Sequence, residues 1–347
     1  MTYQEGIISG IFGAYYKIIP RYDLDREYDA RLRGKLRLER KKSEHTGLRH
    51  LLIVGDRIEY ENKDNEEYTI INLLERKNML MRSSEFESHA LGANIDRAVL
   101  IQSIVSPELK INFVDRFLAS CYAGNVNPVI VFTKPDLAES VNSPHLLTPE
   151  KYLKLGYSVF VLNLLSQNDS EELGKFKSIC ENGVSLFSGN SGTGKSTIIN
   201  KLFERNVQKT SHISSSTGKG RHTTTNSRLF ISENKRAMYI DTPGVKEWGI
   251  SHLSADQIYA SFPEINPYIS QCKFNNCDHS ANASGCRIQE IINLSVENAA
   301  NPPISLERLK SMNAMLDSLQ YSGKIRTGDY IKETGRIRSG KIKKRNN

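Results

Sequence analysis

Hydrophobic and polar positions follow three different patterns along this chain of 347 residues. From about residue 5 to 75, short alternating runs such as 6–11 and 70–74 are interrupted by glycines and charges, and no helical period is sustained. This pattern predicts a small all-β unit, for which we expect a five-stranded barrel.

From about residue 95 to 250, apolar runs alternate with segments of helical period such as 113–122. This alternation is typical of a parallel sheet covered by helices. The predicted strands are the runs 98–101, 129–132, 159–162, 184–187 and 238–240. Beyond about residue 255 the strand pattern ends, and a helix is predicted over 306–319.

The composition is that of an ordinary soluble globular protein, with 38% hydrophobic and 25% charged residues. No apolar run approaches the roughly 20 residues of a membrane span, and residues 1–6 do not start a secretory signal. The five cysteines are an odd number, and three of them fall within fifteen residues. That favours a metal site in a reducing compartment over a disulfide framework, so we expect a cytoplasmic monomer without a membrane segment.

The net charge of +8 is concentrated in two segments. Residues 324–347 carry nine Lys and Arg against two acidic residues, and residues 31–49 carry eight against two. Clustered cations release counterions when they neutralise phosphates, so both segments predict contact with nucleic acid. The alternative is a solvated loop and a solvated tail. Because its basic residues are spaced by glycines, we expect the tail to be flexible.

The strongest chemical signal is a loop that fits G-x-x-x-x-G-K-[ST] in full. In such a loop backbone N–H groups turn inward around phosphates, the lysine reaches the β and γ phosphates, and the hydroxyl binds Mg²⁺. A predicted strand precedes the loop, and a helix over 197–203 follows it, with its N-terminal dipole toward phosphate. The predicted nucleotide contacts are Gly189, Asn190, Ser191, Gly192, Thr193, Gly194, Lys195, Ser196 and Thr197.

A second segment indicates which base is bound. Thr133, Lys134, Pro135 and Asp136 follow a predicted strand and resemble the guanine-reading [NT]-K-x-D motif of GTPases. There the carboxylate accepts from N1–H and the exocyclic amino group of guanine, a pairing that adenine cannot make. We therefore expect GTP and GDP as ligands, with ATP as the competing interpretation.

Two further segments supply the expected switch groups. Asp241 to Gly244 follows an apolar strand and resembles D-x-x-G, whose Asp holds Mg²⁺ through water and whose Gly N–H senses the γ-phosphate. The alternative is an ordinary Pro-Gly turn. The polar stretch 218–225 suits a mobile loop, and Thr224 is its candidate for the Mg²⁺ and γ-phosphate contact.

The order of these motifs differs from that of an ordinary GTPase, in which the phosphate loop comes first. Here the guanine motif precedes the phosphate loop, so the order predicts a circularly permuted domain.

Val245 follows D-x-x-G where a Ras-like enzyme has its water-orienting Gln, and Val cannot position water. His222 is the candidate catalytic residue in the chain itself, and the alternative is that a partner supplies the group.

A Cys/His cluster lies near the C-terminal end. Cys272, Cys277, His279 and Cys286 offer three thiolates and one imidazole, a set that suits one structural, tetrahedral Zn²⁺. The alternative is a set of free thiols. Cys121 and Cys180 lie in the sheet-and-helix region and are expected in the core.

Together these motifs resemble the ribosome-small-subunit-dependent GTPase A family over roughly residues 5–320. The runs 33–37, 54–57, 76–78 and 94–96 also sit where that family has similar runs. The chain departs from the family at Thr133, in a longer gap between His279 and Cys286, and at Asn163-Leu164, where a Ser-Ala guanine contact is expected.

The resemblance implies a multi-domain α/β protein. It predicts an RNA-binding OB-fold over 1–76, a circularly permuted P-loop GTPase domain over 77–250, a helical zinc-binding domain over 251–320 and the basic tail over 321–347. It also implies late maturation of the small (30S) ribosomal subunit, contact with its rRNA, hydrolysis stimulated by that subunit, and a catalytic role for His222.

Two other functions remain open at this point. One is an RNA-binding assembly clamp in which nucleotide binds but turnover is irrelevant, which Val245 permits. The other is a permuted GTPase that acts on the large ribosomal subunit, against which the flanking OB-fold and zinc cluster argue.

Overall fold

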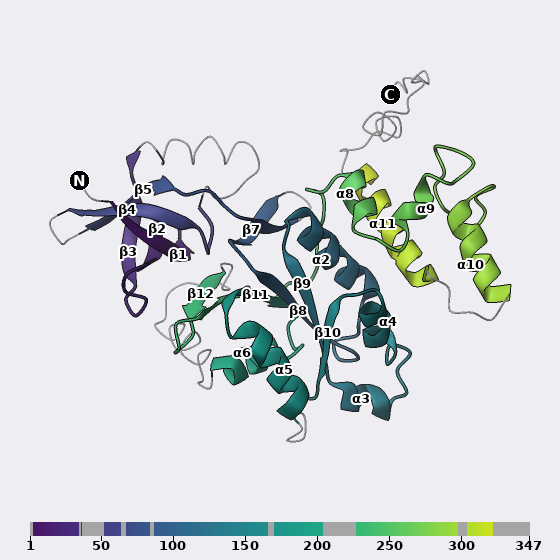
Figure 1. The fold of residues 1–347 in the computed structure, drawn as a ribbon, viewed down its shortest axis with the longest axis horizontal. Coiled ribbons are helices and arrows are strands. Elements are labelled where there is room, and N and C mark those ends of the chain that lie inside the picture. Colours follow the sequence, from purple (N-terminus) through teal and green to yellow (C-terminus); the bar gives the residue numbers. More distant parts are fainter. Residues whose placement is uncertain are drawn as a thin grey trace, which may run out of the picture. The chain divides into compact units, whose positions relative to one another are not determined.

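The computed structural model describes most of the chain (Figure 1). Its described residues are 3–34, 36, 52–63, 67–83, 87–165, 170–203, 227–297 and 304–321. The chain divides into two compact units. The first comprises Met1–Arg82, Phe86–Leu109 and Gly124–Trp248, and the second Ser83–Glu85, Lys110–Ala123 and Gly249–Asn347.

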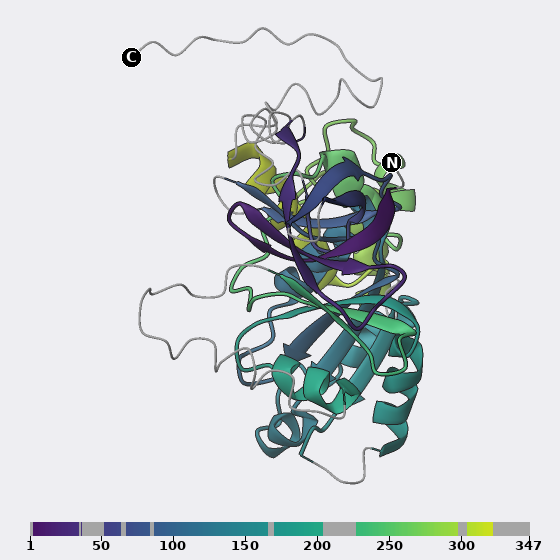
Figure 2. The same cartoon turned by 90° about the vertical axis from the view of Figure 1, so that its left-hand side faces the viewer.

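Five strands of the first unit close into a barrel in the order β1-β2-β3-β5-β4 (Figure 2). Neighbouring strands are antiparallel except β3 and β5, which are parallel. Ile8, Tyr16, Ile18, Ile58 and Ile70 fill the interior and are fully buried. The predicted OB-fold barrel is confirmed. Its strands are β1 Gln4–Phe12, β2 Tyr15–Pro20, β3 Tyr28–Leu32, β4 Arg57–Lys63 and β5 Glu67–Leu73.

A six-stranded sheet forms the centre of the first unit, in the order β10-β9-β8-β11-β13-β12. All neighbours are parallel except β12, which lies antiparallel to β13 at one edge. Each predicted strand falls inside one of the parallel strands, while the four-residue β12 and the small sheet β6-β7 were not predicted. The strands are β6 Met79–Ser83, β7 Ser88–Ala93, β8 Arg97–Ser103, β9 Asn127–Thr133, β10 Ser158–Leu162, β11 Gly183–Gly189, β12 Arg228–Ile231 and β13 Ala237–Asp241.

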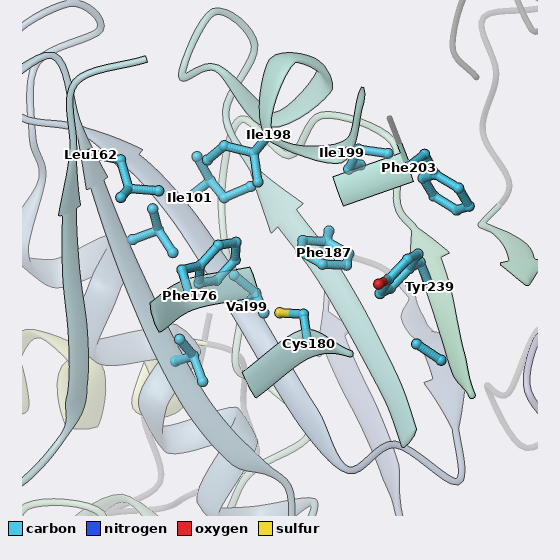
Figure 3. Close-up of a cluster of buried hydrophobic side chains, with 13 residues drawn as sticks. Val99, Ile101, Leu162, Phe176, Cys180, Phe187, Ile198, Ile199, Phe203 and Tyr239 are labelled. Carbon is cyan, nitrogen blue, oxygen red and sulfur yellow. The ribbon is translucent and has the colours of Figure 1, made fainter. Parts of the chain in front are cut away.

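One face of this sheet is covered by two helices, α5 (Ser170–Cys180) and α6 (Lys195–Phe203). Figure 3 shows Phe176 and Cys180 of α5 beside strand residues such as Val99 and Phe187 in one apolar cluster. All four side chains are fully buried. Burying one large apolar side chain contributes about 1.5–3 kcal/mol of stabilising free energy. This cluster is therefore a main source of stability for the sheet. Two further helices in the described part of this unit are α3 Pro135–Ser140 and α4 Thr148–Lys154.

The second unit is helical. Its helices are α2 Ile111–Ala123, α8 Ala255–Ala260, α9 Asn266–Ile269, α10 Arg287–Glu297 and α11 Leu306–Tyr321. α11 confirms the helix predicted over 306–319, and no strand occurs among the described residues beyond 255. Nor does any helix in the described ranges combine the length and apolar character needed to cross a membrane.

Arg308 of α11 joins three parts of the second unit. Its guanidinium forms ion pairs with Asp115 of α2 and with Glu264, the latter at 2.7 Å. The same guanidinium lies 4.2 Å from the centre of the Phe262 ring. Arg308 and Asp115 are almost completely buried, and a buried charge of this kind is costly to leave without its partner. The pair therefore holds α2 to the C-terminal helices, although α2 lies far from them in the sequence.

Three of the sequence runs on which the family resemblance rests meet where the barrel joins the sheet. Asp56 is fully buried, and both of its carboxylate oxygens accept from Arg76, at 2.6 and 2.8 Å. Asn78 exchanges two hydrogen bonds with Ile95, two residues before β8, both 2.7 Å. Burial raises the pKa of Asp56, whereas Arg76 counteracts this effect.

Gly55 lies in the same junction, with its φ of +90° in the left-handed region. A Cβ at this position would stand 2.3 Å from the Ala93 carbonyl oxygen. Gly55→Ala should therefore lower the free energy of unfolding by about 2–4 kcal/mol, measured by denaturant titration. Gly13→Ala is the matched control, because Gly13 also has a positive φ (+62°) but nothing within 4 Å of its Cβ position. The control should lose about 1 kcal/mol, and equal losses in the two variants would contradict the close approach.

Candidate functional site

The predicted phosphate loop connects β11 to α6 at the carboxyl edge of the sheet. Gly192 and Gly194 have φ of +80° and +93°, which residues with a side chain rarely adopt. A Cβ at Gly189 would lie 2.4 Å from the Ile101 carbonyl oxygen, and one at Gly194 would lie 2.6 Å from Leu164 Cδ1. The loop can follow this path because these positions are glycine. Ser196 follows at the start of α6, where its side chain is exposed.

Thr133, the last residue of β9, is attached to the phosphate loop. Its hydroxyl donates to the Thr193 carbonyl at 2.7 Å, and the Thr193 hydroxyl donates to the Asn190 carbonyl at 2.9 Å. Thr133 is fully buried. A threonine thus links the guanine motif to the phosphate loop at the position where the commoner residue is asparagine.

The rest of the guanine motif follows at once. Lys134 has a left-handed φ of 59° and donates through Nζ to the Ser106 carbonyl. Asp136 lies half-buried in the first turn of α3. Leu162, the last residue of β10, pairs with Thr133, so Asn163 and Leu164 begin beside the same strand end.

The predicted D-x-x-G segment runs along the other side of the phosphate loop. Thr242 is fully buried, and its N–H and hydroxyl both donate to the Phe187 carbonyl, at 3.1 and 2.9 Å. Val245 N–H donates to the Gly189 carbonyl at 3.1 Å. A Cβ at Gly244 would be 3.5 Å from the Ser191 nitrogen. These contacts hold the Asp241–Val245 backbone against the loop.

Lys195 and Asp241, the two predicted charged ligands, form an ion pair with each other. Their side chains are only 12% and 23% exposed, so screening by water is limited. Each charge neutralises the other. Lys195 is the residue expected to contact the phosphates, and Asp241 is the residue expected near Mg²⁺. Their contact places the two side by side.

The structure therefore brings the predicted residues of the phosphate loop, the guanine motif and D-x-x-G to one edge of one sheet. The carboxyl edge of an open α/β sheet is the usual place for a ligand. His222 and Thr224 lie outside the described residues. The sequence did not point to Ser106 or to Pro107, which has an atom 3.9 Å from the Cβ position of Gly192, because an ordinary loop after β8 carries no motif.

The second unit contains the predicted metal cluster. The ligand atoms of Cys272, Cys277, His279 and Cys286 all lie within 4.8 Å of one another. His279 Nδ1 is 3.6 Å from the sulfurs of both Cys272 and Cys286, which are 4.0 Å apart. His279 is 2% exposed, and its backbone carbonyl accepts from Gln289 Nε2 at 2.8 Å. The four side chains converge and could hold a metal ion.

Burial governs the protonation of this cluster. It raises the pKa of Cys277 to about 12, and it also raises the pKa of Cys286. It lowers the pKa of His279, which keeps the imidazole neutral and available as a ligand. A cation bound by these groups would have to displace the thiol protons.

The sequence matches the model of one protein family, described as RsgA GTPase, over residues 73–251. A protein of Cytophaga hutchinsonii named small ribosomal subunit biogenesis GTPase RsgA is 35% identical over 298 residues, which cover 83% of this chain and 92% of the relative. A protein of the same name from Flavobacterium psychrophilum is 34% identical over 258 residues, 72% of this chain and 76% of the relative.

Two solved structures share the fold. YjeQ from Thermotoga maritima has a TM-score of 0.64 and 23% identity, with 92% of this chain and 99% of that chain covered. YloQ, described as a circularly permuted GTPase, has a TM-score of 0.61 and 21% identity, with 92% and 96% covered. These similarities confirm the permuted fold predicted from the order of the motifs.

Zinc binding to the cluster should release protons. Zn²⁺ binds thiolates and not thiols, so protons should leave the cysteines as the ion binds, and affinity should fall as the pH is lowered because protons compete for the sulfurs. Calorimetry in two buffers of different ionisation enthalpy counts the released protons. Cys277→Ser should remove one of them, whereas Cys121→Ala, a buried cysteine of α2 outside the cluster, should leave the count unchanged. Zinc binding without proton release would contradict the assignment.

Proposed function

This chain belongs to the RsgA GTPase family, and from that premise we propose that the small ribosomal subunit stimulates its hydrolysis of GTP late in subunit maturation. The family resemblance predicted from the motifs is confirmed, and the chain is a GTPase of small ribosomal subunit biogenesis. The observation that carries the proposal is the meeting of phosphate loop, guanine motif and D-x-x-G around the Lys195–Asp241 pair.

GTP would bind across the carboxyl edge of the sheet. The residues from Gly189 to Thr197 would hold its phosphates, with Lys195 moving from Asp241 to the β and γ phosphates. Asp136 would read the guanine base, with Lys134 and Pro135 beside it. Thr133 would support the phosphate loop through its hydrogen bond to Thr193 rather than contact the base.

Magnesium would be held with the nucleotide by Ser196, Asp241 and Thr224, with Gly244 close to the γ-phosphate. The donor set fits, because the Ser196 hydroxyl is exposed at the start of α6 and Asp241 already pairs with a cation. When bound, the ion would neutralise charge on the phosphate oxygens.

The water-positioning group must come from a residue other than Val245. Val245 is 3% exposed, and its N–H is bonded to Gly189, so it has neither the chemistry nor the position to orient water. His222 is the residue that we propose for this role.

The flanking parts would contact the ribosome. We assign residues 1–76 to an rRNA-binding barrel, 77–250 to the GTPase domain, 251–320 to a zinc-binding domain and 321–347 to a basic tail. Arg31 of the basic segment 31–49 is exposed, and its guanidinium lies 4.7 Å from the centre of the exposed Tyr15 ring. A cation beside an aromatic ring suits a nucleic-acid strand, which offers both phosphates and bases.

One Zn²⁺ in the Cys272–Cys286 cluster would be structural, since four protein ligands leave no open position. The protein would act as a cytoplasmic monomer.

Turnover of GTP with and without purified small subunits tests the proposal directly. Small subunits should accelerate GTP hydrolysis strongly, whereas large subunits, or ATP in place of GTP, should not. Lys195→Ala should abolish nucleotide binding because the loop loses its phosphate cation. Lys201→Ala, at the other end of the same helix, is the matched control and should behave as the wild type.

The outcomes separate the alternatives. Stimulation by large subunits alone would contradict the assigned partner. If small subunits bind the protein in a GTP-dependent way but do not accelerate its turnover, stimulated hydrolysis is contradicted and the protein is an assembly clamp. Unchanged GTP affinity in Lys195→Ala would overturn the site.

His222→Ala should lower the stimulated turnover by on the order of 10²-fold and leave GTP affinity unchanged, because a residue that orients water acts mainly in the transition state. Single-turnover kinetics with saturating small subunits measure the effect. His145→Ala, a half-buried loop histidine in the same unit, is the control. If His222→Ala keeps the wild-type stimulated rate, the group comes from the ribosome.

A further inference from the structure

The hairpin β12–β13 lies between two segments expected to respond to the nucleotide. It begins at Arg228, three residues after the predicted switch threonines, and it ends at Asp241. Arg228 and Asp241 are register partners in the antiparallel ladder. A displacement of Asp241 along the strand axis would therefore be transmitted to Arg228 through the backbone pairing.

Arg228 is also attached to the barrel. Its Nη2 lies 3.2 Å from Oε2 of Glu27, which precedes β3. The other oxygen of Glu27 accepts from the Ser9 hydroxyl at 2.6 Å. Ser9 is fully buried and occupies the bulge of β1, where the pairing with β2 shifts register. Glu27 is thus fixed to the barrel wall on one side and holds Arg228 on the other.

Apolar contacts join the hairpin to α6. The rings of Phe230 and Tyr239 pack edge-on against Phe203 at the end of α6, with ring centres 6.0 and 4.8 Å away. α6 begins at Lys195, the partner of Asp241. Next to the barrel, by contrast, a hollow of about 330 Å³ separates the hairpin from the loop before β3. Both residues of the Glu27–Arg228 ion pair line this hollow, so a polar contact joins the hairpin to the loop there.

From this arrangement we infer that Glu27 and Arg228 form a positioning pair, through which the barrel holds Asp241 in the register that binding of GTP with Mg²⁺ requires. The inference rests on the proposed function, because it needs Asp241 to leave Lys195 when the nucleotide binds. The path consists of five side chains and one strand pairing: Ser9, Glu27 and Arg228, and across the ladder Asp241 with Lys195. By reciprocity, a ligand on the barrel that displaces Glu27 would change the affinity for GTP.

A second ion pair offers a matched control. Asp25 and Lys235 also join the barrel loop to the hairpin, and both side chains are about half exposed or more. Lys235 lies in the turn between β12 and β13, far along the hairpin from Asp241. Its removal takes away the same kind of contact at the same interface without touching the register partner of Asp241.

The test measures how much free Mg²⁺ the full-length protein needs for half-maximal binding of a slowly hydrolysed fluorescent GTP analogue. Glu27→Gln keeps the acceptor for Ser9 and removes the charge that holds Arg228, and Arg228→Gln removes the other partner. Each should raise the required Mg²⁺ by roughly 3- to 10-fold. Asp25→Asn and Lys235→Gln should leave it at the wild-type value. Binding of the analogue in excess chelator should be the same in all five proteins.

The double variant separates a coupled pair from two independent effects. Because each single change already breaks the contact, Glu27→Gln with Arg228→Gln should show the shift of one single variant and not the product of two. The test and control variants should unfold at the same temperature. If the Glu27–Arg228 pair were purely structural, the test variants would unfold at a lower temperature than the controls. If Arg228→Gln does not fold, Glu27→Gln decides the test by itself, since Glu27 lies at the surface of the barrel.

Failure of the inference is distinct from failure of the proposed function. A wild-type protein that binds no GTP analogue with Mg²⁺ would overturn the proposed function and, with it, the inference. A wild type that binds normally, with Glu27→Gln indistinguishable from Asp25→Asn, would overturn the positioning pair alone.

Discussion

The nucleotide site depends on the parallel pairing of β11 with β8 and β13. β8 and β13 flank β11, so all three strands end at one edge of the sheet. That edge collects Gly189, Asp241 and, through β9 beside β8, Thr133. A parallel sheet places its carboxyl ends together whatever the order in which the strands are joined. A permuted chain therefore builds the same edge, and the permutation changes which segments leave the sheet toward the rest of the protein.

Hydrogen bonds fix the positions of the loops that meet at the carboxyl edge of the sheet. The hydroxyls of Thr133 and Thr242 donate to carbonyls of the phosphate loop and of β11, and the N–H of Val245 donates to Gly189. Loss of a buried hydrogen bond of this kind is costly, because the carbonyl acceptor is left without a donor and water cannot reach it. Together with the Lys195–Asp241 pair they hold three loops together, and preorganisation of this kind lowers the ordering cost of binding.

The two compact units divide the predicted contacts with the ribosome. The barrel and the nucleotide site belong to the first, whereas α2 and the metal cluster belong to the second. The chain crosses between the units at several points, and one crossing follows the loop after β8, where Ser106 accepts from Lys134 and Pro107 approaches Gly192. The chain then continues into α2, which Arg308 holds to the C-terminal helices. This crossing thus starts beside the guanine motif.

The sequence by itself determined the chemistry: the phosphate loop, the guanine motif, D-x-x-G and the Cys/His cluster are local patterns, and their glycines and charges follow directly from ligand chemistry. It also determined the barrel, the parallel strands and the last helix, because burial leaves alternation in the barrel strands, continuous apolar runs in the parallel strands and a helical period in the helix. Only the tertiary structure decided that Thr133 supports Thr193, that α2 joins the C-terminal helices through Arg308, and that Glu27 reaches Arg228. Each of these pairs residues far apart in the chain, and a single polar side chain has no period from which its distant partner could be predicted.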